Sequence, residues 1–349
     1  MSAIQWHKRD ATRSSQIAAG YTPAKLGQPE RCLEAALDAR ARLLADPQTT
    51  VCRVLNGAAD GFDGLVIEKL GDVLVAQLHE GRLALPASSV RPLCERLRRQ
   101  LNARAVYAKF FARDRAAAAR ETDARQRDPV PWLGEPVEAE LAVLENGIRF
   151  LVRPYDGYSV GLFLEHRANR LRVRRLAAGR RVLNAFAYTG GFSVAAALGG
   201  AASTVSIDVS KRFLEWGKRN FAANGLDPDS HTFICSDIFD CYRRARRQRR
   251  HFDLIILDPP TFARLRRPKR TFAIAEDLDR LVADAVELLD PDGRLLLATN
   301  HRGTPRRRLE RSVAEACAGR GWEVVERPRL PADFRGDPDY AKSVLVRVG

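Results

Sequence analysis

The sequence predicts an α/β protein whose second half forms a doubly wound, mostly parallel β-sheet, preceded by a smaller α+β domain. Short apolar runs alternate with helix-length segments after residue 180, as in parallel strands joined by crossover helices. Two strand-rich stretches in the first half turn on Gly71-Asp72 and Asn146-Gly147, dipeptides typical of tight hairpins. A chain of 349 residues, 45% of them apolar, is long enough for two domains.

The amino-terminal segment is expected to be a helical extension over residues 1–50. Residues 29–45 carry apolar positions at helical spacing, and Pro47 closes this segment. The first residues lack the apolar stretch of a secretory signal, and no apolar run approaches the roughly 18 residues of a membrane span. We therefore expect a cytoplasmic protein without a membrane partner, although a basic transit peptide stays open as an alternative.

A small α+β domain is expected over residues 51–137. Residues 64–78 form two β-rich runs, a helix is expected from a Ser88-Ser89 cap through residue 101, and residues 103–110 are again strand-like. A polar stretch then links this domain to the next.

The second domain is expected over residues 138–349 and opens with the Asn146-Gly147 hairpin. Its last two apolar runs leave no room for a crossover helix between them, so the final strand is expected to insert antiparallel. The seven runs span residues 181–187, 204–210, 231–237, 252–260, 293–300, 322–326 and 342–348.

Acidic and glycine residues stand at the carboxyl ends of the first four of these runs, where doubly wound sheets bind ligands. Asp208 is placed to accept both hydroxyls of a ribose, and Asp237 to accept an exocyclic amine such as that of adenine. Asp258 is followed by Pro259 and Pro260, which fix the loop leaving the sheet. The turn after the first run contains Asn184, Phe186, Tyr188, Thr189, Gly190 and Gly191.

Together these positions predict a nucleoside-shaped pocket, although each has a structural alternative. Glycines also serve helix–sheet packing, and an aspartate at a strand end is often a helix cap. A nicotinamide dinucleotide site would carry the G-x-G-x-x-G fingerprint. Here an aromatic residue replaces the first glycine, which favours an uncharged methionine tail over a pyrophosphate.

The charge balance indicates a polyanionic partner. The chain holds 58 Lys and Arg against 43 Asp and Glu, a formal net charge of +15. An arginine-rich composition explains part of this excess, but the basic residues are clustered in the second half. The clusters are residues 170–181, 243–250, 264–270 and 306–311.

Four segments of the chain carry a resemblance to a known family: NAFAYTGGFSVAA, SIDVSKRFLEWGKRNFAANGL, FDLIILDPPTF and GLFLEHRANR. Through them the chain resembles the class I S-adenosylmethionine (SAM)-dependent methyltransferases that act on bacterial large-subunit (23S) ribosomal RNA. The resemblance covers roughly residues 51–349. It implies a Rossmann-like methyltransferase sheet, SAM as cofactor and RNA as partner. The amino-terminal PUA module of some members is not recognisable in residues 1–50.

The resemblance also implies which residues hold the cofactor. Phe163 and Arg167 are expected at the methionine end, whereas His166, a lone histidine between charged residues, reads more simply as a surface or capping residue. The six histidines show no metal-ligand spacing, so no metal site is expected. The full cofactor-binding set is Phe163, Arg167, Asn184, Phe186, Tyr188, Thr189, Gly190, Gly191, Asp208, Ser210, Asp237 and Ile238.

Two branches of this family differ in chemistry. The cytosine-C5 branch needs a cysteine thiolate in a segment after the fifth strand, but here that segment is Thr299-Asn300-His301-Arg302-Gly303. The guanine-N7 half of a bifunctional ribosomal RNA methyltransferase resembles this chain in GLFLEHR, in DPPTF followed by basic residues, and in the Asn300 segment. Cysteine chemistry is therefore disfavoured, and reduced thiols are expected at Cys32, Cys52, Cys94, Cys235, Cys241 and Cys317.

Guanine N7 is nucleophilic without losing a proton, so catalysis there reduces to holding the base in line with the methyl group. Thr261, where an exocyclic-amine methyltransferase more often has an aromatic residue, lowers the expectation of adenine-N6 chemistry. The expected catalytic set is Asp258, Pro259, Pro260, Phe262 and Asn300. The expected RNA-binding set is Arg264, Arg266, Arg267, Lys269, Arg270 and Arg302, with residues 243–250 toward the opposite edge of the sheet.

Two hypotheses from other classes stay open. A noncatalytic RNA-binding or assembly protein could keep a relic SAM pocket. The presence of Asp208, Asp237 and Asp258 argues against this, because a pocket that no longer binds its cofactor would be expected to lose such residues. A nicotinamide-dependent oxidoreductase would bind NAD instead of SAM. Titration with SAM and with NAD distinguishes the methyltransferase, the noncatalytic protein and the oxidoreductase.

Overall fold

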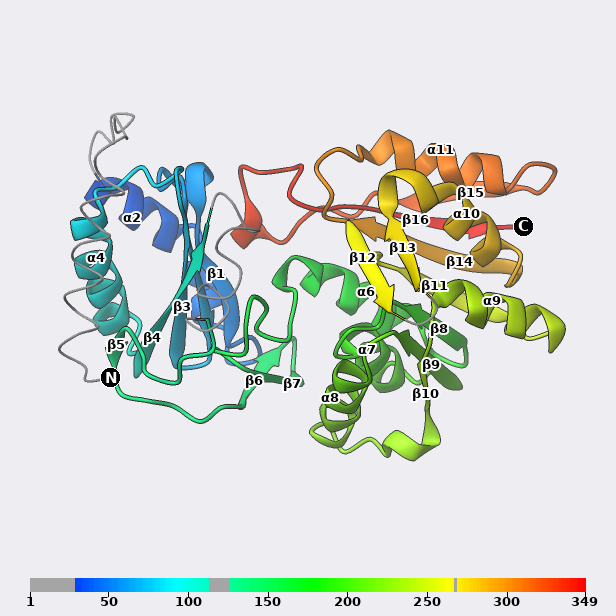
Figure 1. The fold of residues 1–349 in the computed structure, drawn as a ribbon, viewed down its shortest axis with the longest axis horizontal. Helices are drawn as coiled ribbons and strands as arrows, with labels where there is room; N and C mark the ends of the chain where they lie inside the picture. The colour runs from blue at the N-terminus through cyan, green and yellow to red at the C-terminus, as the bar shows by residue number, and fades with distance from the viewer. Residues whose placement is uncertain (1–28, 113–125, 267–268) are drawn as a thin grey trace. The chain divides into compact units, whose positions relative to one another are not determined.

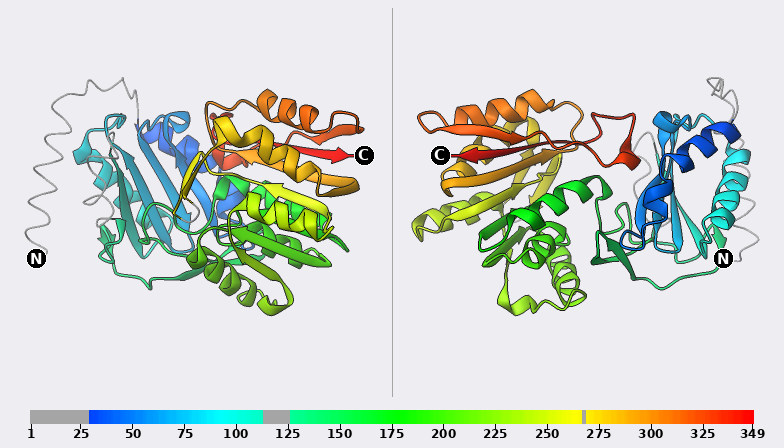
Figure 2. Two further views of the ribbon diagram at one scale, coloured as in Figure 1. Left: turned by 45° about the vertical axis from the view of Figure 1, so that its right-hand side comes forward. Right: turned by 180° about the vertical axis from the view of Figure 1, so that it is seen from behind.

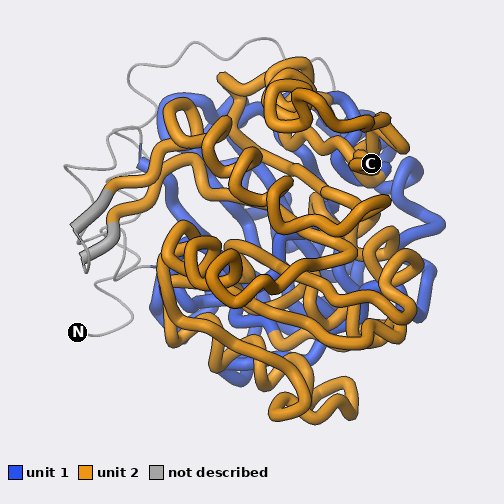
Figure 3. Tube along the Cα trace, turned by 90° about the vertical axis from the view of Figure 1, so that its right-hand side faces the viewer, with its two compact units in different colours: residues 1–147, 152–164, 332–336 blue, residues 148–151, 165–331, 337–349 orange. Residues whose placement is uncertain are grey.

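A computed structural model describes residues 29–112, 126–266 and 269–349 of the chain (Figure 1). The chain divides into two compact units (Figure 3). Unit 1 comprises Met1–Gly147, Val152–Leu164 and Ala332–Gly336, and unit 2 comprises Ile148–Leu151, Glu165–Pro331 and Asp337–Gly349. Within the described ranges no helix is long and apolar enough to span a membrane.

Unit 1 is built on a five-stranded sheet in the order β1-β2-β3-β4-β5. The β2–β3 hairpin turns at Gly71, whose φ of +64° confirms the predicted turn. β3 and β4 run parallel because α4 crosses between them. The elements are β1 (Val51–Asn56), β2 (Leu65–Leu70), β3 (Val73–His79), α4 (Ala87–Gln100), β4 (Ala105–Phe111) and β5 (Leu133–Gly134), with the 3-10 turn η1 (Gly57–Asp60) after β1.

The cap predicted for α4 was misplaced. The helix begins at Ala87, and Pro86 occupies the N-cap without a side-chain hydrogen bond. Ser88 and Ser89 therefore lie inside the first turn. Pro86 fixes its own backbone and starts the helix by geometry, so no hydroxyl cap is required there.

The amino-terminal helices contribute to the core of unit 1. In α2 (Pro29–Asp38), Leu33, Ala36 and Leu37 are buried at helical spacing, in one cluster with Cys52 and Val54 of β1. The short helix α3 (Ala41–Leu44) follows.

A turn from the far end of the chain completes the core of unit 1. The 3-10 turn η4 (Ala332–Phe334) buries Asp333, whose carboxylate accepts the Arg53 backbone N–H at 2.9 Å. The Arg53 guanidinium lies 4.1 Å from the centre of the Phe334 ring, and the Arg40 guanidinium donates to the Asp333 carbonyl at 2.9 Å. Unit 1 therefore depends on residues that follow most of unit 2 in the sequence.

Unit 2 contains a seven-stranded sheet in the order β10-β9-β8-β11-β14-β16-β15 (Figure 1). The strands from β10 to β14 run parallel, and β16 lies antiparallel between β14 and β15, as predicted. The strands are β8 (Arg181–Ala185), β9 (Ser203–Asp208), β10 (Thr232–Cys235), β11 (Phe252–Leu257), β14 (Leu289–Thr299), β15 (Trp322–Glu326) and β16 (Lys342–Val348).

Helices cover both faces of this sheet because alternate strand residues point to opposite sides (Figure 2). Ile255 and Leu257 of β11 join the cluster under α9, α10 and α11, whereas Leu254 and Ile256 join the cluster under α6 and α7. The helices of unit 2 are α6 (Arg167–Leu176), α7 (Gly191–Leu198), α8 (Lys211–Ala222), α9 (Ile238–Arg247), α10 (Ile274–Val286) and α11 (Arg306–Ala316), with the 3-10 turn η3 (Pro228–Ser230). The 3-10 turn η2 (Leu164–His166) begins at the last residue of a unit 1 segment and continues into unit 2.

The described residues also form two hairpins that belong to neither of the larger sheets. β6 (Leu141–Glu145) and β7 (Ile148–Val152) pair about Asn146 and Gly147, which have φ of +50° and +76° as a type I′ turn requires. β12 (Phe262–Arg266) and β13 (Lys269–Ala273) pair antiparallel between β11 and α10. The basic stretch after Asp258, read from the sequence as a loop, therefore forms a strand pair.

Candidate active site at the carboxyl ends of the strands

The sheet order of unit 2 places its ligand edge at the ends of β8 and β11. From β8 the chain moves outward through β9 and β10, then returns to add β11 and β14 on the other side. The carboxyl ends of these parallel strands meet at one edge, and the direction of winding reverses between β8 and β11. Ligands of doubly wound sheets bind at such a switch point.

The loop after β8 holds an unusual backbone. Phe186, Tyr188 and Gly190 have φ of +60°, +51° and +75°, and a positive φ is unfavourable for the two aromatic residues. Tertiary hydrogen bonds hold this loop: Ala187 N–H donates to the Ile207 carbonyl at 2.8 Å, and the Asn220 amide donates to the Thr189 carbonyl at 2.8 Å. A strained and well-held loop at a switch point is typical of a binding site.

Glycine at position 190 has a second physical reason. A Cβ atom there would lie 3.4 Å from the Cα atom of Gly217 in α8, so the loop and the helix approach through two glycines. Gly191 begins α7, and Thr189 is buried. The predicted glycine turn therefore exists, with the backbone close to α8.

Asp208 ends β9 with both carboxylate oxygens turned to backbone donors of this edge. One oxygen accepts the Tyr188 N–H at 2.9 Å and the other accepts the Ser210 N–H at 2.8 Å. Burial raises the pKa of Asp208 above its ordinary value, and the backbone N–H groups offset part of this effect. Each carboxylate oxygen has a further lone pair, so the group can also accept the two hydroxyls of a ribose.

Two other predicted cofactor ligands act as helix caps. Ser210 caps α8 by accepting the Phe213 N–H at 3.3 Å, and Asp237 caps α9 by accepting the Phe239 N–H at 2.9 Å. Ile238 is buried in the core beneath α9. Their contribution to cofactor binding stays a prediction.

The Asn184 side chain is directed into the protein. It is 1% exposed, and its amide donates to the Ser193 hydroxyl at 2.9 Å. Ser193 in turn lies 2.7 Å from the Ser206 hydroxyl. Asn184 thereby joins β8 to α7 and β9 behind the loop, which positions the loop from inside.

The aromatic side chains of the loop contact neighbouring elements. The Phe186 ring lies 5.4 Å from the Phe272 ring of β13, and the Tyr188 ring lies 4.5 Å from the Phe213 ring of α8. The two residues expected at the methionine end belong to different units. Phe163 is 39% exposed in unit 1, and Arg167 is buried at the start of α6 in unit 2.

His166 is the site residue that sequence reasoning missed. It is 2% exposed rather than on the surface, and it occupies the N-cap position of α6 as the capping alternative predicted, although its side chain makes no cap hydrogen bond. Its Nε2 atom lies 3.1 Å from an Asp258 oxygen at the end of β11. Burial lowers the pKa of His166, but the charge and hydrogen bond of Asp258 and the charge of Glu165 outweigh this effect, so the pKa is raised. The signal available in the sequence was the GLFLEHR segment, which is one of those that carry the family resemblance.

The other predicted catalytic residues follow β11 and β14, which are neighbours in the sheet. Pro259 and Pro260 continue from Asp258, and Phe262 is 51% exposed at the start of β12. Asn300 is exposed directly after β14. An exposed ring and polar groups at one edge can receive a planar base.

The basic residues differ in their surroundings. Arg264 is exposed, with its guanidinium 5.4 Å from the Phe262 ring centre. Arg302 is held by Asp337 at 3.1 Å, and this hydrogen bond raises its pKa. In the 243–250 cluster, Arg246 pairs with Asp284 and Glu287 at 2.7 Å. Arg266, Lys269 and Arg270 belong to the β12–β13 hairpin, whereas Arg267 lies outside the described residues.

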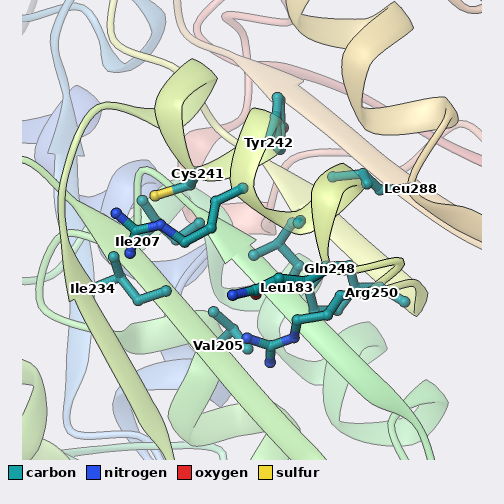
Figure 4. Close-up of a pocket in the computed structure, with 12 residues that line it drawn as sticks. Leu183, Val205, Ile207, Ile234, Cys241, Tyr242, Gln248, Arg250 and Leu288 are labelled. Atoms are coloured by element: carbon teal, nitrogen blue, oxygen red, sulfur yellow. The ribbon is translucent and has the colours of Figure 1, made fainter.

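A cavity of about 30 Å³ beneath α9 is distinct from this edge (Figure 4). Apolar strand residues such as Leu183 and Val205 line it, together with Arg250 and Phe252 at the amino end of β11. This volume suits a single water molecule and cannot hold a nucleoside.

The sheet order, the strained loop after β8 and the carboxylates at successive strand ends together define a class I SAM-dependent methyltransferase. The sequence agrees, because residues 71–347 match the S-adenosylmethionine-dependent methyltransferase family. The chain belongs to this family.

The chain is similar to several proteins that are named as methyltransferases. Ribosomal RNA large subunit methyltransferase K of Neisseria meningitidis serogroup B is 39% identical over 196 residues, covering 56% of this chain and 54% of that protein. Ribosomal RNA large subunit methyltransferase I of Citrobacter koseri is 34% identical over 299 residues, covering 84% of this chain and 72% of that protein. A crystal structure of a methyltransferase complexed with SAH has a TM-score of 0.79 at 28% identity, covering 91% of this chain and 80% of that one.

Proposed function

We propose that the protein transfers a methyl group from SAM to large-subunit ribosomal RNA, at N7 of a guanine. Relatives named as large-subunit ribosomal RNA methyltransferases support the RNA substrate. The net charge of +15 supports it independently, since phosphate contacts dominate binding to nucleic acids. The single observation that favours N7 over cytosine C5 is the composition of the edge at β11, which carries the Asp258 carboxylate and, among the described residues, no cysteine at the carboxyl ends of β11 or of its neighbours β8 and β14.

The six cysteines, all within the described residues, argue against a covalent mechanism. Cys235 ends β10, which is separated from β11 by β9 and β8, so the two strands lie roughly 14 Å apart at ordinary strand spacing. Burial raises the pKa of the Cys241 and Cys317 thiols and raises that of Cys94 to about 12. Burial therefore keeps these three in the unreactive thiol form.

SAM, when bound, supplies an electrophilic methyl group on a sulfonium. Asp208 would accept the ribose hydroxyls, and the loop from Phe186 to Gly190 would bring backbone close to the cofactor. Asp237 is assigned to the adenine end in addition to its capping role. These residues bind and orient, and none of them is asked to move a proton.

On the RNA side, Phe262 would stack on an extruded base, and Asp258 would accept the N–H groups of its Watson–Crick edge. Guanine offers N1–H and N2–H donors on that edge, while N7 lies on the opposite side of the ring. A carboxylate that accepts these donors orients N7 without contacting it. Extrusion of the base is required because a stacked guanine cannot enter a site at a sheet edge.

The experiment is nucleoside mass spectrometry of large-subunit ribosomal RNA from a strain that lacks this gene. We expect loss of one 7-methylguanosine, restored by the wild-type gene and not by a D258A variant. Loss of a 5-methylcytidine instead would overturn the choice of target atom, and an unchanged nucleoside profile would overturn the ribosomal RNA substrate.

A further inference from the structure

We propose that His166 is a positioning residue of the methyl-transfer site, because its Nε2 hydrogen bond holds the Asp258 carboxylate in the orientation that receives the target base. This inference rests on the proposed function, since it assigns Asp258 to the base. It concerns a residue that the sequence pattern places on the surface.

The His166 ring is enclosed on several sides by elements of unit 2. Its Nδ1 atom lies 3.2 Å from the Asn169 amide nitrogen, which also donates to the Ser343 hydroxyl of β16 at 2.9 Å. The Phe192 ring of α7 lies 5.5 Å from the imidazole ring. With only 2% of His166 exposed, contacts from α6, α7 and β16 fix the direction of its Nε2 atom.

Asp258 connects this buried network to the strand-end edge. One carboxylate oxygen meets the His166 Nε2 atom at 3.1 Å, yet 23% of the Asp258 side chain is exposed. A carboxylate without a partner rotates about χ2, whose energy profile is broad. The imidazole contact removes this freedom before the base arrives, so the acceptor direction is set in advance.

The raised pKa of His166 is consistent with this geometry. Asp258 and Glu165 favour the imidazolium form, while burial and the charge of Arg170 oppose it. In the neutral tautomer protonated at Nε2, Nδ1 accepts from the Asn169 amide; in the imidazolium Nδ1 carries a proton, and the Asn169 amide must present its oxygen instead. The Nε2 atom donates to Asp258 in both forms. The hydrogen bond therefore persists in either of these forms.

The size of the effect follows from the cost of misplacing a reacting group. A displacement of about 1 Å lowers a rate by up to about 100-fold. We expect H166A to lower kcat by about 10- to 100-fold with little change in SAM affinity. H166Q should recover most of the loss, because a glutamine amide can donate to the same oxygen.

The test compares the full chain as wild type, H166A, H166Q, D258N and the H166A/D258N double variant. H231A is the matched control, because His231 is also in unit 2 and lies away from β11, with a hydrogen bond to the Thr204 hydroxyl at 3.0 Å and its ring centre 4.7 Å from that of Phe221. Each variant is assayed for single-turnover methyl transfer from labelled SAM to ribosomal RNA, for SAM affinity by calorimetry, and for thermal stability.

We expect H166A to transfer slowly, H166Q to transfer at close to the wild-type rate, and the double variant to be no slower than D258N. Such non-additivity shows that His166 acts through Asp258. Wild-type transfer by H166A, equal losses in H166A and H231A, or additive losses in the double variant would overturn the proposal. If H166A does not fold, H166F takes its place in every comparison, because its ring fills the space of the imidazole but cannot donate to Asp258. The identity of the methylated atom is read separately from the nucleosides, so an error in the proposed target does not alter these ratios.

Discussion

Replacing Asp208 by alanine should weaken SAM binding while the protein stays folded. The carboxylate would accept hydrogen bonds from the ribose, and hydrogen bonds to charged groups contribute about 1.5–3 kcal/mol. Loss of one such bond corresponds to a roughly 10- to 150-fold increase in Kd. Asp208 also accepts the backbone N–H groups of Tyr188 and Ser210, so its removal further loosens the loop after β8.

The assay is isothermal titration of the D208A variant and wild type with SAM, with circular dichroism to verify folding. D227A is the matched control, because Asp227 is also a carboxylate of unit 2 that accepts a backbone N–H, that of Asp229 at 3.0 Å, but it stands at the N-cap of η3 before β10 and not at the carboxyl end of a strand. D227A should bind SAM with an affinity close to that of wild type. Unchanged SAM affinity in D208A would refute the assignment of this carboxylate to the ribose.

Three further predictions address the thiols, the RNA surface and a buried lysine. Replacing all six cysteines by serine or alanine should leave methyl transfer measurable; a folded single variant without activity, or a covalent RNA adduct, would restore C5 chemistry. Alanine at Arg264, Arg266, Arg267, Lys269 and Arg270 should weaken RNA binding and leave SAM affinity unchanged. The slope of log binding constant against log salt concentration should fall by about 0.7–0.9 per lost phosphate contact. If RNA affinity is unaltered by these changes and is lowered instead by alanine substitutions at residues 243–250, RNA binds at the opposite edge of the sheet. Burial lowers the pKa of Lys109 from 10.5 to about 8, so urea unfolding should show stability rising with pH between these values, where the unfolded chain binds a proton that the folded chain does not. In K109M this rise should be smaller, and an equal rise in both proteins would contradict the burial argument.

Local signals predicted most of the fold. Strand periodicity and hairpin dipeptides are encoded within a few residues, so the parallel strands, the antiparallel β16 and the turns at Gly71 and Asn146-Gly147 could be read directly. The acidic residues at strand ends were also readable, since the position of a strand end follows from the apolar run before it.

Features that depend on distant residues could not be read in this way. The Asp333 contact with Arg53 joins positions 280 residues apart, and the Asn169 contact with Ser343 joins positions 174 apart. His166 lies between charged neighbours, which suggests a surface position, yet Asp258 and Asn169 satisfy its ring nitrogens inside the protein. The hairpin β12–β13 was hidden because its strands are rich in arginine and lysine, which do not signal a strand.

The most direct test of the central claim is a reconstituted reaction with a defined product. Large-subunit ribosomal RNA from the deletion strain is incubated with the purified full-length chain and methyl-labelled SAM, then digested to nucleosides and separated. We predict that the label migrates with 7-methylguanosine and is absent with D208A at a SAM concentration below the Kd of that variant. The claim of guanine-N7 methylation would be contradicted by label in 5-methylcytidine or in another nucleoside. It would also be contradicted if wild-type protein that binds SAM transferred no label to this RNA.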